Sequence, residues 1–324
     1  MKAWVIHEPG GPEKFRLEEM PDPEPRSGWA LIRVRAFGVN RSEWFTRRGD
    51  SPTVRFPRVL GIECVGELVD PGGLDLPTGS TVAAIMGGMG RQFDGSYAQY
   101  TRVPHGCVFS LQTSLPWERL AALPEMLQTT HGSLHAALEI DRAESLLIRG
   151  GTSSIGMAAL ALAKRAGLQV GTTTRDPKKT AELEAAGADD VWVDQGALAE
   201  QIMSRRGRPY DRVLELVGTT TLLDSLRCVG RGGIVCMTGI LGGAWVLEQF
   251  HPMGDVPTAV KLTSYSGEAA DMTPEQLQNY VDLVQAGKLE VRTGPVFAFE
   301  ELVSGAYPDG RESGGWEDRR PRPG

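Results

Sequence analysis

Residues 144–180, ESLLIRGGTSSIGMAALALAKRAGLQVGTTTRDPKKT, decide the fold of this chain. Ser145–Arg149 is a short apolar run that is typical of a buried parallel strand. Gly150–Gly156 is a glycine-rich turn that leads directly into an alanine-rich helix through Ala166, and Gln169–Thr173 follows as a second strand. The stretch therefore predicts the first half of a doubly wound parallel sheet.

The glycine-rich turn predicts a phosphate site. Small residues let backbone N–H groups approach a pyrophosphate, and the positive end of the following helix favours its charge. An isolated turn of this kind is as often only a connection between a strand and a helix. The second strand behind it favours a dinucleotide.

The end of that second strand indicates which dinucleotide is bound. An acidic residue there would select the 2′-hydroxyl of NAD. The chain instead has Arg175, Lys178 and Lys179 after Thr174, and these cations suit the 2′-phosphate of NADP. Asp176 among them argues the other way, but the balance favours NADP(H).

Composition limits the remaining possibilities. The chain has 324 residues, 41% of them hydrophobic, which is enough for two domains. A net charge of −7 and an isoelectric point near 5.4 argue against nucleic acid or an anionic membrane as partner. No signal peptide or spanning segment is expected, so we expect a cytoplasmic protein. Its four cysteines show no metal or disulfide spacing.

The change in residue pattern along the chain suggests one domain interrupted by another. Residues 1–110 are rich in short extended runs and in Gly and Pro turns, whereas residues 126–265 alternate helix and strand. Residues 274–287 have helical apolar spacing. The runs expected to be extended are Ala3–His7, Trp29–Phe37, Cys64–Val69, Thr81–Ile85, Ser96–Val103, Val213–Val217 and Gly233–Thr238, with a helix near Thr221–Cys228.

Five stretches together resemble the zinc-free quinone oxidoreductase (zeta-crystallin-like) branch of the medium-chain dehydrogenase/reductase superfamily. They are VRAFGVN (34–40), FPRVLGIECVG (56–66), DGSYAQY (94–100), AALP (121–124) and the turn at 150–156. The resemblance implies an α/β protein in which a GroES-like β-rich catalytic domain is split around a Rossmann-type doubly wound parallel sheet. The domains expected from it are residues 1–125, 126–268 and 269–324, with cofactor and substrate in the cleft between them.

The resemblance also raises the question of zinc. Zinc alcohol dehydrogenases of this superfamily use a cysteine where this chain has Asn40 and a histidine where it has Ile62. Glu63 remains, but one carboxylate does not make a zinc site. We therefore expect a metal-free site.

Without a Lewis acid, hydride delivery to an electron-poor acceptor is the reaction that stays feasible. The resemblance implies an NADPH-dependent reductase of quinones or α,β-unsaturated carbonyls, with Asn40, Phe45, Glu63 and Tyr97 near the acceptor. Asn40 would bond substrate or ribose, and Tyr97 would donate a hydrogen bond. The alternative is structural: Asn40 satisfies backbone, Phe45 lies in the core and Tyr97 packs at a hairpin.

Cofactor contacts follow from both the resemblance and the fold. Ser153 and Ser154 stand where relatives commonly have glycines, and they would add two hydroxyl donors for phosphate. His131 and His135 are expected to be partly buried structural residues. The contacts expected for the cofactor are Thr129, Gly151, Thr152, Ser153, Ser154, Ile155, Gly156, Thr174, Arg175, Lys179, Val217, Gly218, Thr238, Gly239 and Ile240.

Two other functions remain open from the sequence. One is a dinucleotide-binding redox sensor or stress protein with little catalysis. The other is an enoyl-thioester reductase, for which Arg41, Arg47 and Arg48 would supply a cationic rim if they do not form surface ion pairs. Relatives are commonly homodimers, and strand-edge pairing near Trp245–Phe250 is one candidate contact.

The C-terminal tail departs from the resemblance. Relatives end in a β-branched strand, whereas residues 305–324 are polar and rich in Pro and Gly. A reading frame displaced by one nucleotide allows a family-like ending, AHTRMDESRAAGKIVV. We therefore expect a frame-shifted tail from about Gly305, unless the tail is naturally divergent.

Overall fold

The computed structural model describes residues 1–306, and the chain forms two compact units. Unit 1 comprises Met1–Gln128, Glu268–Lys288 and, within the described residues, 293–306. Unit 2 comprises Thr129–Gly267 and Leu289–Arg292. The predicted frame-shifted tail lies outside the described residues apart from its first two positions.

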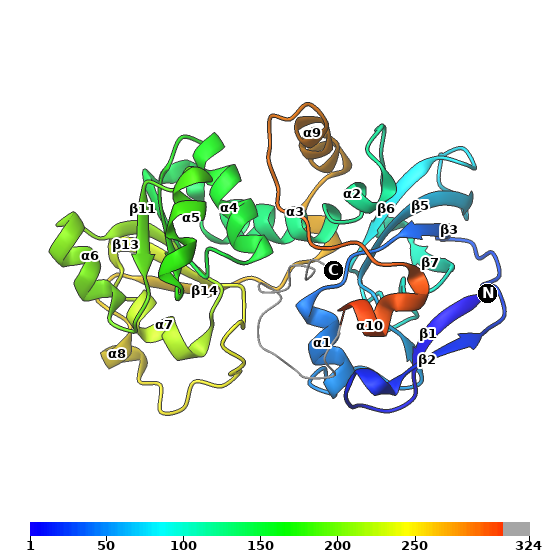
Figure 1. Cartoon of the computed structure of the whole chain (residues 1–324), viewed down its shortest axis with the longest axis horizontal. Coiled ribbons are helices and arrows are strands. Elements are labelled where there is room, and N and C mark those ends of the chain that lie inside the picture. Colours follow the sequence, from blue (N-terminus) through cyan, green and yellow to red (C-terminus); the bar gives the residue numbers. More distant parts are fainter. Residues whose placement is uncertain (307–324) are drawn as a thin grey trace. The chain divides into compact units, whose positions relative to one another are not determined.

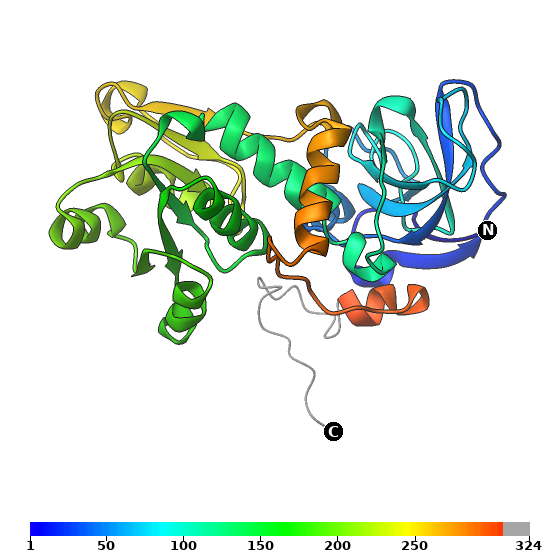
Figure 2. The same cartoon turned by 90° about the horizontal axis from the view of Figure 1, so that it is seen from above.

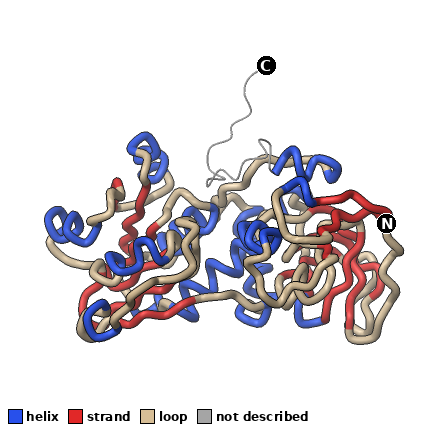
Figure 3. The backbone as a smooth tube through the Cα atoms, turned by 90° about the horizontal axis from the view of Figure 1, so that it is seen from below, coloured by secondary structure: helices blue, strands red, loops and turns tan. Residues whose placement is uncertain are grey.

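Unit 1 is built on antiparallel sheets. A five-stranded sheet has the order β7-β3-β5-β6-β8, and a three-stranded sheet has the order β2-β1-β4. Figure 3 shows the strands of this unit in red, near the N-terminus. The strands are β1 (Lys2–Ile6), β2 (Phe15–Glu19), β3 (Trp29–Ala36), β4 (Arg58–Val59), β5 (Glu63–Asp70), β6 (Thr81–Ile85), β7 (Tyr100–Pro104) and β8 (Val108–Ser110).

The helices of unit 1 are mostly short. Helix α9 buries Leu277, Tyr280, Val281 and Val284, as its predicted helical spacing requires, and begins in a capping box between Thr273 and Gln276. Figure 2 shows α9 along its length in orange. The α-helices that lie in this unit or begin in it are α1 (Arg41–Arg48), α2 (Trp117–Leu120), α3 (Pro124–His131), α9 (Pro274–Gln285) and α10 (Leu302–Ala306).

Unit 2 contains a six-stranded sheet with the order β11-β10-β9-β12-β13-β14, in which every neighbouring pair is parallel. Numbered from β9, this order is the 3-2-1-4-5-6 order of a doubly wound dinucleotide fold. The predicted fold class is therefore confirmed. The strands are β9 (Ser145–Arg149), β10 (Gln169–Thr174), β11 (Asp190–Val193), β12 (Tyr210–Glu215), β13 (Val229–Met237) and β14 (Lys261–Ser264).

Helices cover both faces of this sheet. Helices α4 and α5 lie against one face, and α6 and α7 lie against the other (Figure 1). Leu147, Trp192 and Val213 of the sheet pack with Ile202 of α6 and Leu222 of α7 in one apolar core. The helices are α4 (Ser154–Arg165), α5 (Thr180–Ala185), α6 (Leu198–Arg206), α7 (Thr219–Ser225) and α8 (Pro252–Asp255).

One predicted element differs from the structure. The extended run expected over Ser96–Val103 forms a strand only from Tyr100, because Ser96 and Tyr97 use their N–H groups on the Leu60–Gly61 turn. The segment Trp245–Phe250, where strand-edge pairing with a second copy is expected, contains no strand within the single chain, and the pairing itself stays a prediction. Within residues 1–306 no helix has both the length and the apolar character that a membrane span requires.

Close backbone packing at the start of α4 generates a prediction. A Cβ on Gly156 would lie 2.5 Å from the carbonyl oxygen of Gly150 and 2.9 Å from the carbonyl carbon of Gly151, so the first turn of α4 rests on the backbone of the glycine turn. We expect Gly156→Ala to lower the free energy of unfolding by about 1–3 kcal/mol in urea titrations, although alanine favours helix.

The matched control is Gly254→Ala in α8, where the nearest atom to the added Cβ is 3.9 Å away. This variant should unfold like the wild type. Equal stability of the two variants would contradict the packing described for Gly156.

Candidate functional site

The turn between β9 and α4 is shaped to meet an anion with its backbone. Gly150 has a φ of +95°, and a Cβ on Gly151 would lie 1.6 Å from Oγ1 of Thr172. Both positions therefore require glycine. The N–H groups of Ser154 and Ile155 open α4, where helix geometry leaves them without intrahelical acceptors. These donors suit a diphosphate.

The two serine hydroxyls do not act as predicted. Ser153 Oγ donates to the carbonyl oxygen of Gly150 at 2.8 Å and accepts from the N–H of Gly156 at 3.1 Å, so it caps α4. Its proton is already used inside the turn. Ser154 is exposed and keeps its hydroxyl available. The expectation of two hydroxyl donors is therefore wrong for Ser153.

The end of β10 presents basic side chains to solvent. Thr174 is buried, Arg175 and Lys178 are exposed, and Lys179 is half-buried. Asp176 Oδ1 accepts the N–H of Lys178 at 3.0 Å and so caps the short 3₁₀ helix that follows. One oxygen of the carboxylate that argued for NAD therefore caps its own loop, and the exposed cations Arg175 and Lys178 lie on either side of it in the chain.

The turn after β12 and the end of β13 lie together. One carboxylate oxygen of Glu215 accepts the N–H groups of Val217 at 2.7 Å and Gly218 at 2.9 Å. The carbonyl oxygen of Glu215 accepts the N–H groups of Thr238 at 2.9 Å and Gly239 at 3.2 Å. Gly218 has a φ of +106°, and a Cβ there would lie 3.3 Å from Cα of Ile240. Five predicted cofactor residues are therefore brought together.

All these segments follow the carboxyl ends of parallel strands. The chain leaves β9 toward β10 on one side and later adds β12 on its other side, so the order reverses at β9. Such a reversal is where open α/β sheets bind ligands. We call the segments 150–156, 174–179, 217–218 and 238–240 the cofactor edge.

The two histidines are buried or half-buried, as the sequence predicts. The rings of His131 and His135 lie 4.5 Å apart between centroids, and His131 is 9% exposed. Burial, and then the neighbouring His135, lowers the pKa of His131 to about 4. His131 is therefore neutral at neutral pH. Thr129, a predicted cofactor contact, is buried in the same helix α3.

Unit 1 holds a buried network around Asn40. Asn40 precedes α1, and its Nδ2 donates to Oε1 of Glu63 at 2.9 Å. The other oxygen of Glu63 accepts the N–H of Glu125 at 2.8 Å. A Cβ on Gly38 would lie 2.0 Å from Oε1 of Glu63, so this glycine makes room for the carboxylate. Two predicted site residues, Asn40 and Glu63, thus touch.

Glu43 belongs to this network, and the sequence reasoning missed it. Its Oε1 accepts the N–H of Ile62 at 3.0 Å, and its Oε2 accepts the N–H of Asn40 at 3.0 Å. It therefore ties the start of α1 to the residue before β5. The signal was present, because Asn40 followed three residues later by Glu43 is the spacing of a capping box.

Burial perturbs both carboxylates. It raises the pKa of Glu63 well above its usual range, and the nearby charge of Glu125 adds to the effect. Burial likewise raises the pKa of Glu43 to about 7, although two hydrogen bonds from backbone N–H groups oppose the shift. Glu43 therefore exchanges its proton near neutral pH.

Tyr97 and Phe45 lie in the core. Tyr97 is fully buried, with its ring centroid 4.7 Å from that of Phe37. Phe45 is 8% exposed and meets Trp44 edge to face at 4.8 Å. Both positions support the packing roles that the sequence left open, and their contact with an acceptor stays a prediction.

The arginine rim expected for a thioester carrier is wrong for Arg47. Arg47 is fully buried and donates to the carbonyl oxygen of Gly10. Nε of Arg48 lies 3.5 Å from Oδ2 of Asp50, and the Arg48 guanidinium stacks over Trp44. Arg41 also stacks over Trp44, with its guanidinium carbon 4.9 Å from the ring centroid. Arg41 and Arg48 therefore contact neighbouring side chains of α1 and of the residue that follows it.

No group of three or more His, Cys, Asp or Glu side chains within residues 1–306 is arranged to hold a metal ion. Asn40 and the buried Ile62 supply no soft ligand, and all four cysteines are buried. A metal-free site stays a prediction.

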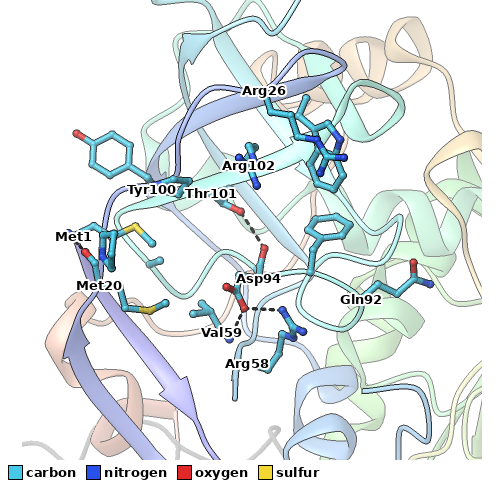
Figure 4. Close-up of a pocket in the computed structure, with 16 residues that line it drawn as sticks. Met1, Met20, Arg26, Arg58, Val59, Gln92, Asp94, Tyr100, Thr101 and Arg102 are labelled. Carbon is cyan, nitrogen blue, oxygen red and sulfur yellow. Dashed lines mark hydrogen bonds and ion pairs between the residues drawn. The ribbon is translucent and has the colours of Figure 1, made fainter. Parts of the chain in front are cut away.

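A cavity of about 480 Å³ in unit 1 contains none of the predicted site residues. Figure 4 shows the ion pair between Arg58 and Asp94 on one side of the cavity. Arg26 and Arg102 lie on the other side. Arg26 and Arg102 stack on Trp29, with guanidinium carbons 4.9 and 5.7 Å from the ring centroid. The cavity thus lacks the perturbed carboxylates found near Asn40.

Comparisons with known proteins agree with this geometry. Residues 26–113 match the alcohol dehydrogenase GroES-like domain, and residues 154–286 match the zinc-binding dehydrogenase family. A quinone oxidoreductase of Rattus norvegicus is 27% identical over 95% of this chain and 93% of its own. An acryloyl-coenzyme A reductase of Sulfurisphaera tokodaii is 26% identical over 94% of this chain and 95% of its own. A mycobacterial protein solved with NADPH has a TM-score of 0.83 at 24% identity and covers 96% of both chains.

The chain therefore belongs to the medium-chain dehydrogenase/reductase superfamily of oxidoreductases, as its sequence resemblance predicts. Its relatives include quinone oxidoreductases, and the antiparallel unit 1 carries the GroES-like match.

The buried carboxylate of Glu43 predicts a pH-dependent stability. Its pKa is 4.5 when exposed and about 7 in the fold, so the folded state binds more protons in that interval. The stability from this group is fully present below pH 4.5 and is lost as pH rises through 7. As pH rises from 4.5 to 7, the free energy of unfolding of the wild type should fall by about 3 kcal/mol relative to that of Glu43→Gln, measured by urea unfolding.

Glu118→Gln provides the control, because Glu118 is exposed on α2. It should follow the wild-type pH profile. A constant difference between wild type and Glu43→Gln at every pH would show that Glu43 does not titrate as described.

Proposed function

We propose that the protein is an NADPH-dependent, zinc-independent reductase that transfers hydride to a quinone or an α,β-unsaturated carbonyl. The observation that carries the proposal is the end of β10, where Arg175 and Lys178 are exposed and Asp176 caps its own loop. A guanidinium and an ammonium group suit a 2′-phosphate, which only NADP(H) carries. The quinone oxidoreductase relatives support the acceptor, and a similar fold solved with NADPH supports the cofactor.

The donors of the cofactor edge fit this cofactor. The N–H groups of Ser154 and Ile155 would hold the diphosphate, and Arg175, Lys178 and Lys179 would hold the 2′-phosphate. Val217, Gly218, Thr238, Gly239 and Ile240 would line the nicotinamide half. When bound, NADPH supplies a hydride from C4 of its nicotinamide.

In unit 1, Asn40 would bind the acceptor. Its amide nitrogen carries two protons, and one is given to Glu63 at 2.9 Å. The carboxylate thereby fixes which way the amide points. The second N–H would donate to the acceptor oxygen, on which negative charge grows as hydride arrives. Because one proton must accompany each hydride, the buried pair Glu43 and Glu63 is a suitable place for that proton.

Two related substrates remain within this chemistry. The acryloyl-coenzyme A reductase relative supports an enone activated as a thioester. The buried position of Arg47 removes one cation from the rim that such a carrier would need. We therefore favour a small quinone or enone over a carrier-bound substrate.

We also propose a homodimer formed through unit 2. Strand β14 is the last strand of its sheet within the described residues, and Leu262 on it is 38% exposed. Trp245 and Val246 are 52% and 75% exposed. An uncovered strand edge with exposed apolar side chains suits a self-association surface. Light scattering coupled to gel filtration tests it.

The activity test follows NADPH oxidation with an ortho-quinone and with a small enone, each repeated with NADH and after a chelator. We expect turnover that prefers NADPH and is insensitive to the chelator. Tight NADPH binding without turnover would instead support the dinucleotide-binding sensor, and loss of turnover with the chelator would contradict the metal-free site.

Cofactor choice is tested at the end of β10. The double variant Arg175→Gln/Lys179→Gln should raise KM for NADPH about tenfold or more, because the 2′-phosphate loses two cationic partners, and should leave KM for NADH unchanged. Arg231→Gln, an exposed arginine on β13, is the matched control. An equal rise for both cofactors would contradict 2′-phosphate recognition.

The role of Asn40 is tested by Asn40→Ala. Losing a donor to the growing negative charge should lower kcat about 100-fold while the Kd of NADPH stays the same. Asn279→Ala, on the exposed side of α9, is the control. A wild-type kcat for Asn40→Ala would leave Asn40 as a helix-capping residue only.

A further inference from the structure

Arg149 is the last residue of β9 and directly precedes the glycine turn. Its side chain is fully buried, which is rare for arginine. The guanidinium nitrogens of Arg149 donate hydrogen bonds to residues outside β9. The acceptors belong to Asp194, Thr221, Asp224 and Ser225.

One arm of this network reaches across β10. Nε of Arg149 donates to Asp194 Oδ2 at 2.7 Å, and Nη2 donates to Oδ1 at 3.0 Å. Asp194 follows β11, and its own N–H donates to the carbonyl oxygen of Thr174 at 2.8 Å. Since β10 lies between β9 and β11, the arm fixes the point at which residues 175–179 leave the sheet.

The other arm reaches the turn after β12. Nη1 of Arg149 donates to Asp224 Oδ2 at 2.8 Å and to Ser225 Oγ at 3.1 Å. Ser225 Oγ donates in turn to Glu215 Oε2 at 2.5 Å. Glu215 Oε1 holds the N–H groups of Val217 and Gly218, so this arm ends in the nicotinamide half of the cofactor edge.

A planar guanidinium suits this double task. Its donors are fixed in one fork, so the direction of one arm constrains the direction of the other. In a buried site each lost partner leaves a charge or a polar group without compensation, which keeps the network in one arrangement.

We infer that Arg149 is a positioning residue that couples the two halves of the cofactor edge, setting residues 174–179 through Asp194 and residues 217–218 through Ser225 and Glu215. The inference rests on the proposed NADPH binding. It differs from a general role in stability because each arm acts on a different half of the ligand.

The test separates the arms with two probes, NADPH and adenosine 2′,5′-bisphosphate, which lacks the nicotinamide half. Ser225→Ala cuts only the second arm. It should weaken NADPH binding about fivefold to tenfold by calorimetry and leave the bisphosphate within about twofold of wild type. Asp194→Asn cuts the first arm and should weaken both probes by about fivefold or more.

Matched controls lie at the opposite end of β9. Ser145 Oγ donates to Asp211 Oδ2 at 3.1 Å and accepts the N–H of Asp211 at 3.1 Å, which repeats the bonding of a buried serine with a carboxylate. Ser145→Ala and Asp211→Asn should leave both affinities unchanged. Arg149→Met risks failing to fold, so the inference is tested on the arm variants.

The outcomes are distinguishable. If the wild type binds NADPH and Ser225→Ala weakens both probes equally, or neither, the inference is overturned while the proposed function stands. If the controls weaken binding as much as the arm variants, the network is merely structural and the inference is again overturned. If the wild type binds neither probe, the proposed function fails and the inference fails with it.

Discussion

The cofactor edge depends on one buried charge. The last backbone groups of a parallel strand need hydrogen-bond partners from the loop that follows. In unit 2 the loops after β9, β10 and β12 all lie at the same edge of the sheet. Arg149 bonds directly to Asp194 and Asp224 and, through Ser225, reaches Glu215. Without this guanidinium, the carboxylates of Asp194 and Asp224 would each lose an ion-pair partner. The geometry of the cofactor edge therefore depends on an ion network in addition to the apolar packing of the sheet and its helices.

Unit 1 uses burial in a different way. Glu43 and Glu63 are each 2% exposed, and neither forms an ion pair with a cationic side chain within residues 1–306. Backbone N–H groups and the amide of Asn40 are their partners instead. Such donors hold the carboxylates in place but only partly offset the cost of burying charge, so their pKa values rise. The same network that orients Asn40 can therefore hold a proton near neutral pH.

The sequence predicts features that depend on local pattern. The all-buried Ser145–Arg149 run, the glycine turn and the 274–287 helix follow from spacing and residue type, and the structure confirms them. The sequence does not predict partners that are far apart along the chain. Nothing near Arg149 indicates that it meets Asp194 and Ser225, because that contact exists only once β11 and α7 have packed. Ser153 was misjudged for a related reason, since a hydroxyl at the first position before a helix is as able to cap it as to bind a ligand.

The most direct test of the account is amide hydrogen–deuterium exchange of the full chain with and without NADPH. The account predicts that NADPH slows exchange in residues 150–156, 174–179, 217–218 and 238–240, while β1 and β2 of unit 1 exchange at unchanged rates. Protection confined to other segments, or no protection at saturating NADPH, would contradict the assignment of the cofactor edge.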